Sequence, residues 1–123
     1  PIANAAVVAV LEIFEQEDLV GNAERIGEHI RKGLQRIAAR CPYLGDVRGM
    51  GLVMGMEFVK DKQTKEPAPD FIRTVIDRCA ERGLLVGSVG MYGNVIRVAP
   101  PLVITQQQAD ESLAVMESVL LSL

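Results

Sequence analysis

The chain has 123 residues, of which 49% are hydrophobic and 24% charged, with a formal net charge of −3. This length fits one domain, and the composition is too apolar for intrinsic disorder and too evenly charged for a membrane span. The mild negative charge, without a basic cluster, argues against nucleic acids and anionic membranes as partners. Two cysteines, Cys41 and Cys79, are too few for a disulfide scaffold, so we expect a cytoplasmic protein. No charged segment precedes the first apolar run, so a secretory signal is not expected.

Residues 1–16 predict a helix that is apolar on almost every side. Pro1 suits the start of a helix because its φ angle is already fixed near the helical value. Only Asn4 and Glu12 interrupt the apolar residues up to Phe14. Two interpretations stay open: a central core helix, or a helix covered by another part of a longer protein.

Residues 18–40 predict a long amphipathic helix. Its apolar residues recur at steps of three and four and form one stripe: Leu19, Ala23, Ile26, Ile30, Leu34 and Ile37. Gly27 and Gly33 each cost about 1 kcal/mol relative to alanine inside a helix, so they indicate close packing against another backbone. Pro42 ends the helix.

The remaining elements predict a small sheet with further helices. Residues 44–51 are a glycine-punctuated entry to a strand at 52–59, whose alternation indicates that both faces are mostly covered. A polar turn at 60–65 precedes a third helix, which begins at the prolines of 67–69 and ends before Gly83.

Two more strands are expected at 84–86 and 95–98, joined by a glycine-rich connection at 87–93. Thr105 followed by Gln108 has the capping-box pattern and predicts a final helix. The order ααβαββα predicts an α+β fold, in which helices cover a small, mostly antiparallel sheet of about three to four strands.

No combination of residues in the sequence indicates a metal site or a nucleophile with its base. The only histidine, His29, falls in the long helix, where we expect it to be solvated or partly packed. Cys41 and Cys79 lack the spacing of zinc ligands and are expected to pack inertly. The glycines of 49–51 and 87–93 do not join a strand to a helix, so turn geometry is favoured over a phosphate-binding loop.

Arg97 is the residue most indicative of function. It lies in the apolar run Val95–Val98, where an unpaired buried charge would be costly. Its guanidinium could pair inside the molecule, with Glu57 as the obvious partner, or it could bind the carboxylate of a small substrate through two parallel hydrogen bonds. The residues alone do not separate these alternatives. Arg48 poses the same question with weaker support.

Three segments then form a family pattern: PIANAAVVAVLEIFEQEDLV at 1–20, DVRGMGLVMGMEFVKD at 46–61 and RGLLVGSVGMYGNVIRVAPPLVIT at 82–105. They resemble the C-terminal part of class III, pyridoxal-phosphate-dependent aminotransferases, and most of all the 4-aminobutyrate aminotransferases. The stretch GNVIRVAPPL, residues 93–102, is the most specific piece. Ala99 stands where a larger apolar residue is expected, a departure that affects packing and leaves the guanidinium unchanged.

The resemblance implies that residues 1–123 are the C-terminal small domain of a fold-type I enzyme, with residues 1–16 packed on a missing large domain. The large domain would carry the lysine that binds pyridoxal phosphate, and Lys32, Lys60, Lys62 and Lys65 do not fall in that lysine's context. No cofactor-binding or catalytic residue is expected in this chain. By its position in GNVIRVAPPL, Arg97 would bind the substrate carboxylate.

The implied activity is transfer of an amino group from an ω-amino acid such as 4-aminobutyrate to 2-oxoglutarate, by a homodimeric enzyme. This chain alone would be inactive. Two alternatives remain from the sequence: a free-standing regulatory module that binds a small anion, and an interaction domain that docks a partner through its first helix.

Overall fold

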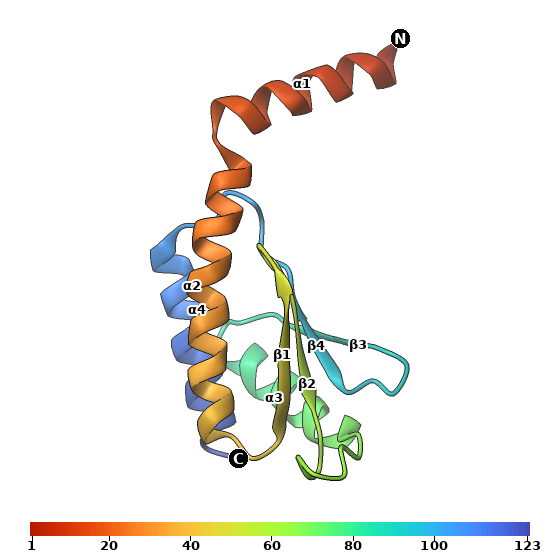
Figure 1. Ribbon diagram of the computed structural model, residues 1–123, viewed down its shortest axis with the longest axis vertical. Helices are drawn as coiled ribbons and strands as arrows, with labels where there is room; N and C mark the ends of the chain where they lie inside the picture. The colour runs from red at the N-terminus through yellow and green to blue at the C-terminus, as the bar shows by residue number, and fades with distance from the viewer.

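The computed structural model describes residues 1–123 as four helices and one four-stranded antiparallel sheet (Figure 1). The elements in chain order are α1 (Ile2–Gln16), α2 (Leu19–Arg40), β1 (Leu44–Met50), β2 (Val53–Phe58), α3 (Pro69–Glu81), β3 (Gly87–Val89), β4 (Val95–Val98) and α4 (Gln106–Leu120). Helices α2 and α4 lie side by side against one face of the sheet (Figure 1). The expected α+β fold with a small antiparallel sheet is confirmed.

The strand order is β1-β2-β4-β3, so β2 and β4 lie at the centre. Side chains alternate between the two faces along each strand. Met54 and Met56 of β2 and Ile96 of β4 point to the helices, and each is at most 2% exposed. They join residues of α2, α3 and α4 in a single hydrophobic core. The side chains between them face the other way, where no element of the chain covers them.

Helix α2 packs as its stripe predicts, with Leu19, Ile26, Ile30, Leu34 and Ile37 buried. The two glycines lie at close approaches. A Cβ at Gly27 would overlap the backbone of Gly51 in the turn between β1 and β2, and one at Gly33 would overlap the side chain of Leu113 in α4. The predicted close approach of another backbone is confirmed at Gly27, whereas the close neighbour of Gly33 is a side chain.

The predicted ends of α3 and α4 are also confirmed. Gly83 has φ +81°, and the amides of Gly83 and Leu84 donate to the carbonyls of Ala80 and Cys79, which closes α3 in a Schellman motif. At the start of α4, the Gln108 amide donates to the Thr105 hydroxyl, and the Thr105 amide donates to the Gln108 side chain.

Two strand predictions were wrong. Residues 44–50, expected as a strand entry, form β1 and pair with β2 in an antiparallel hairpin, so the order is ααββαββα. Residues 84–86, expected as a strand, cross the end of the sheet without pairing, and β3 begins at Gly87. The prediction that both faces of the second strand are covered also fails within this chain, because Val53 is 56% exposed.

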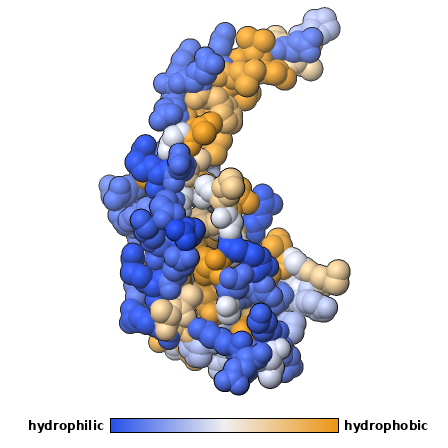
Figure 2. Space-filling model, viewed as in Figure 1, coloured by the Kyte–Doolittle hydropathy of each residue, from blue (hydrophilic) through white to orange (hydrophobic).

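Helix α1 projects from the body of the molecule and contributes no buried residue (Figure 1). Its apolar side chains form a continuous exposed surface, seen in Figure 2: Ile2, Val7, Val8, Val10, Leu11 and Ile13. Asp18, with φ +47°, breaks the chain direction between α1 and α2. The interpretation of α1 as a central core helix is therefore wrong. No helix of the structure, α1 included, combines the length and apolarity that crossing a bilayer requires.

Candidate functional site

The open face of the sheet carries a row of alternating arginine and glycine. Arg48 of β1 pairs with Gly55 of β2, Gly55 pairs with Arg97 of β4, and Arg97 pairs with Gly87 of β3. Arg97 thus has a glycine on each side across the strands. A Cβ at Gly87 would meet no atom within 4 Å, so the space beside the guanidinium on that side is empty.

Backbone and side-chain contacts at both ends of β4 fix its position. Before the strand, the buried Asn94 side chain donates to the Phe58 carbonyl at 3.0 Å, and the Asn94 carbonyl accepts from the Phe58 amide at 2.8 Å. After it, Asn22 of α2 donates to the carbonyls of Leu102 and Ile104 at 2.7 and 3.1 Å. These bonds attach the strand to the core, so Arg97 stands on a rigid element.

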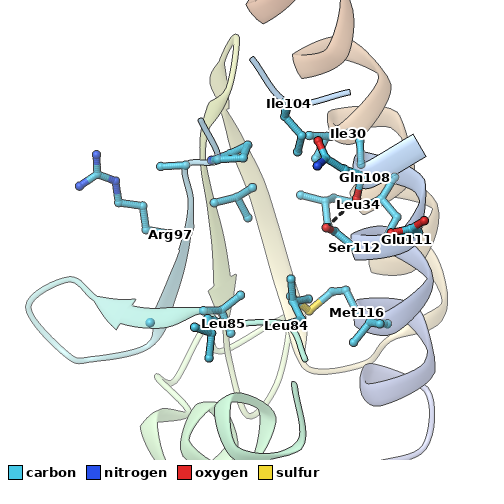
Figure 3. A pocket seen from close by; sticks show the side chains of 18 of the residues that line it. Ile30, Leu34, Leu84, Leu85, Arg97, Ile104, Gln108, Glu111, Ser112 and Met116 are labelled. Carbon is cyan, nitrogen blue, oxygen red and sulfur yellow. Dashed lines mark hydrogen bonds between the residues drawn. The ribbon is translucent and has the colours of Figure 1, made fainter. Parts of the chain in front are cut away.

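The Arg97 side chain extends from the open face, away from α2 and α4 (Figure 3). It is exposed, and none of the ion pairs of the chain includes it. Of the two alternatives left open for Arg97, the internal pair with Glu57 is not formed, because Glu57 binds Arg48. The expectation that the charge sits among apolar side chains is also corrected: the strand alternates, so Ile96 is buried while Arg97 faces outward.

Arg48 holds two carboxylates on the same face. Its Nη1 donates to Asp46 Oδ2 at 2.6 Å and to Glu57 Oε2 at 2.5 Å. The hydrogen bonds that Arg48 donates to Asp46 and, next in size, to Glu57 raise the pKa of Arg48 above its ordinary value. We call Asp46, Arg48 and Glu57 the ion triad. The triad answers the question left open for Arg48, which binds acids of its own chain.

A groove of about 1190 Å³ lies on the other side of β4, between the sheet edge and α4. Its walls include Leu34, Leu84, Ile104 and Met116 (Figure 3). The Ser112 hydroxyl on its α4 wall is already satisfied by the Gln108 carbonyl at 2.8 Å. Arg97 is one of the residues that line the groove, but its guanidinium points away from α2 and α4 (Figure 3), so its charged group does not face the groove.

The other titratable residues lie away from Arg97. Lys32 contacts Glu28, Lys60 contacts Glu66, and Lys62 donates to the Ala38 carbonyl, so these lysines lie on α2 or after β2. His29 Nε2 lies 2.5 Å from Asp110 Oδ1 between α2 and α4, and its side chain is 33% exposed, which agrees with the expected partly packed position. No group of three His, Cys, Asp or Glu side chains lies close enough together to hold a metal ion.

Cys41 and Cys79 are both buried and unpaired, as expected for inert packing residues. Burial raises the pKa of the Cys79 thiol, which makes it less reactive.

Sequence reasoning missed the ion triad. Its signal was present, because Asp46 and Arg48 alternate with Val47 in the manner of a strand that has one polar face. The glycines at 45, 49 and 51 obscured that alternation.

Comparison with known proteins finds a family model and curated relatives that match almost the whole chain. The sequence model described as "Aminotransferase class-III" matches residues 1–120. An alanine/serine racemase of Pyrococcus horikoshii is 44% identical over 95% of this chain and 24% of its own length. The 4-aminobutyrate aminotransferase GabT of Escherichia coli is 35% identical over 94% of this chain and 27% of its own length.

The structure agrees with the sequence comparison. A phospholyase from Arthrobacter, solved in complex with phosphoethanolamine, superposes with a TM-score of 0.92 and 40% identity, over 100% of this chain and 29% of its own. The chain thus spans about a quarter of the length of the relatives that it matches.

Proposed function

The chain belongs to the class III aminotransferase family, and on that premise we propose that residues 1–123 form the C-terminal small domain of a pyridoxal-phosphate-dependent aminotransferase. The rest of the enzyme would be the larger part, since the chain covers 24–27% of these relatives. On this proposal the chain alone is inactive.

Within the whole enzyme, Arg97 would bind the carboxylate of a substrate. The observation that supports this role is a guanidinium that is exposed, unpaired and flanked by Gly55 and Gly87 on the adjacent strands. A planar guanidinium accepts a carboxylate in a bidentate arrangement, which fixes the orientation of the bound acid as well as its position. Held in this way, the substrate would present its reacting carbon in one orientation, and such positioning supplies a large share of rate enhancement.

The cofactor would be held elsewhere. Amino transfer uses pyridoxal phosphate as an electron sink. We propose that the lysine that binds this cofactor lies outside the chain, since Lys32 lies on α2, Lys60 and Lys62 follow β2, and each already contacts a group of its own chain. We place that lysine in the large domain. The same domain would cover the exposed apolar side chains of α1, which no part of this chain reaches.

The proposed substrates are an ω-amino acid resembling 4-aminobutyrate and the acceptor 2-oxoglutarate. The 4-aminobutyrate aminotransferase among the relatives supports this choice. We further propose a homodimeric, cytoplasmic enzyme, a location that suits two unpaired cysteines.

The test is the substitution Arg97→Gln in the full-length enzyme. We expect the KM for 2-oxoglutarate to rise roughly 100-fold, because a charge-assisted bidentate contact is lost. Cofactor absorbance should stay unchanged. Arg73→Gln is the matched control, since Arg73 is an exposed arginine of α3 that takes part in no ion pair. An unchanged KM for both substrates in the Arg97 variant would contradict the assignment.

A second candidate function is amino-acid racemisation, favoured by the 44% identity to the alanine/serine racemase. The two activities differ in their need for an acceptor. The full-length enzyme would be incubated with one enantiomer of alanine or serine and no 2-oxo acid. A racemase would convert it to the mixture of both enantiomers, whereas an aminotransferase would stop after a single half-turnover.

A further inference from the structure

The carboxylate of Glu57 stands between two arginines. Glu57 pairs across the sheet with Asp46 on β1 and with Val95 on β4. Arg48 and Arg97 each lie two residues further along those strands, on the same open face. Both are therefore diagonal neighbours of Glu57, at a spacing that long side chains bridge readily.

The structure shows which arginine Glu57 binds. Its Oε2 lies 2.5 Å from Arg48 Nη1, and the same nitrogen binds Asp46 at 2.6 Å. Gly55, the residue between Arg48 and Arg97 in the row, has no side chain, so only the short side chain of Val95, opposite Glu57, lies beside the path from Glu57 to Arg97. Without Arg48, Glu57 would have Arg97 as its only cationic neighbour on this face.

The consequence for binding is a competition between carboxylates. The Glu57 carboxylate is attached to the same sheet as Arg97, so its effective concentration at the guanidinium is high. A substrate at millimolar concentration would compete poorly with it for Arg97. The open face carries two carboxylates, Asp46 and Glu57, and two arginines. Because Arg48 binds both carboxylates, Arg97 is left without a partner.

We propose that Arg48 is a positioning residue that holds Glu57 away from Arg97 and thereby keeps Arg97 free for the carboxylate of a substrate. This inference rests on the proposed function of Arg97 and extends it to residues that do not touch the substrate. Arg48 then affects the affinity of Arg97 for a carboxylate without contacting the substrate.

The experiment compares four variants of the full-length enzyme: Arg48→Gln, Glu57→Gln, the double variant of both, and Asp46→Asn. Arg48→Gln releases Glu57, so we expect the KM for 2-oxoglutarate to rise roughly fivefold, the size of an exposed ion pair, with kcat unchanged. The double variant should return the KM to the wild-type value, because Glu57 can no longer compete and the remaining acid, Asp46, lies on β1, two strands away from Arg97. Glu57→Gln alone should leave it unchanged.

Asp46→Asn is the matched control, since it alters the same ion triad while the Arg48–Glu57 pair remains. Its KM should equal that of the wild type. A crystal structure of the Arg48→Gln variant supplies a readout independent of kinetics, and it should show Glu57 within hydrogen-bond distance of Arg97.

Two results would overturn the inference: an unchanged KM in Arg48→Gln, or a raised KM that Glu57→Gln fails to restore, which would indicate a structural role for Arg48. Arg97→Gln in the same assay separates this failure from that of the proposed function. If Arg97→Gln raises the KM and Arg48→Gln does not, only the positioning role is lost. If Arg97→Gln has no effect, the binding role of Arg97 itself is wrong.

Discussion

The two faces of the sheet differ in what their side chains contact. On the helix-covered face, Met54, Met56 and Ile96 are closed off by α2, α3 and α4 in one core. On the open face, the same strands present Arg48, Glu57 and Arg97 to solvent. Because successive residues of a strand alternate, each strand serves both faces. Folding of this domain therefore depends mainly on the helix-covered face, while the open face remains available for charged groups.

Two neighbouring residues of β4 should differ most in their contribution to the free energy of unfolding. Ile96→Ala removes a side chain that is 0% exposed, and we expect the free energy of unfolding to fall by about 2–5 kcal/mol. Arg97→Ala, one residue further on, should change it by less than about 0.5 kcal/mol. Urea denaturation of both variants measures the difference. Equal losses would show that the open face also contributes to folding.

A second comparison uses two glycines. Gly27→Ala should destabilise the domain by about 1–3 kcal/mol, because its Cβ would overlap the Gly51 backbone, despite the gain in helix propensity. Gly87→Ala is the control on the open face, where a Cβ meets nothing within 4 Å. We expect its melting temperature to match that of the wild type. A Gly27 variant as stable as the wild type would mean that the turn between β1 and β2 yields easily.

The smallest effect concerns the solvent side of α2. Arg31 donates to both oxygens of Glu28 at 2.7 Å, and this hydrogen bonding lowers the pKa of Glu28 to about 2. A lowered pKa stabilises the folded state above the unfolded value of 4.5, and the contribution is lost as the pH falls toward 2. NMR titration should show the midpoint near 2.

The control for this titration is Arg31→Gln, in which the Glu28 midpoint should move back toward 4.5. An unmoved midpoint would assign the shift to Lys32, which lies 3.4 Å from Glu28.

The sequence predicts those parts of the fold whose pattern is periodic or locally capped. The stripe of α2, the Gly83 end of α3 and the Thr105 capping box are examples, because each depends on residues within a few positions of one another. Strand β1 was missed because Gly45 and Gly49 interrupt its alternation, and β1 forms through pairing with β2 rather than through its own propensity.

The candidate site was predicted in part for a similar reason. The apolar neighbours of Arg97 in the sequence indicate that this arginine is unusual, but they do not indicate which carboxylate it binds. Which carboxylate binds which arginine depends on the register of three strands, and register is not a local property of the sequence. Helix α1 posed a comparable difficulty, because an almost uniformly apolar segment indicates burial without indicating against what.

The left-handed backbone of Asp18 has a geometrical consequence for the arrangement of the whole protein. Helix α1 has 15 residues and is therefore about 22 Å long. A rotation of about 10° at this single residue would displace the far end of the helix by about 4 Å. If α1 is embedded in the rest of the protein, the dihedral angles of one aspartate set how far Arg97 stands from whatever the remaining chain places opposite it.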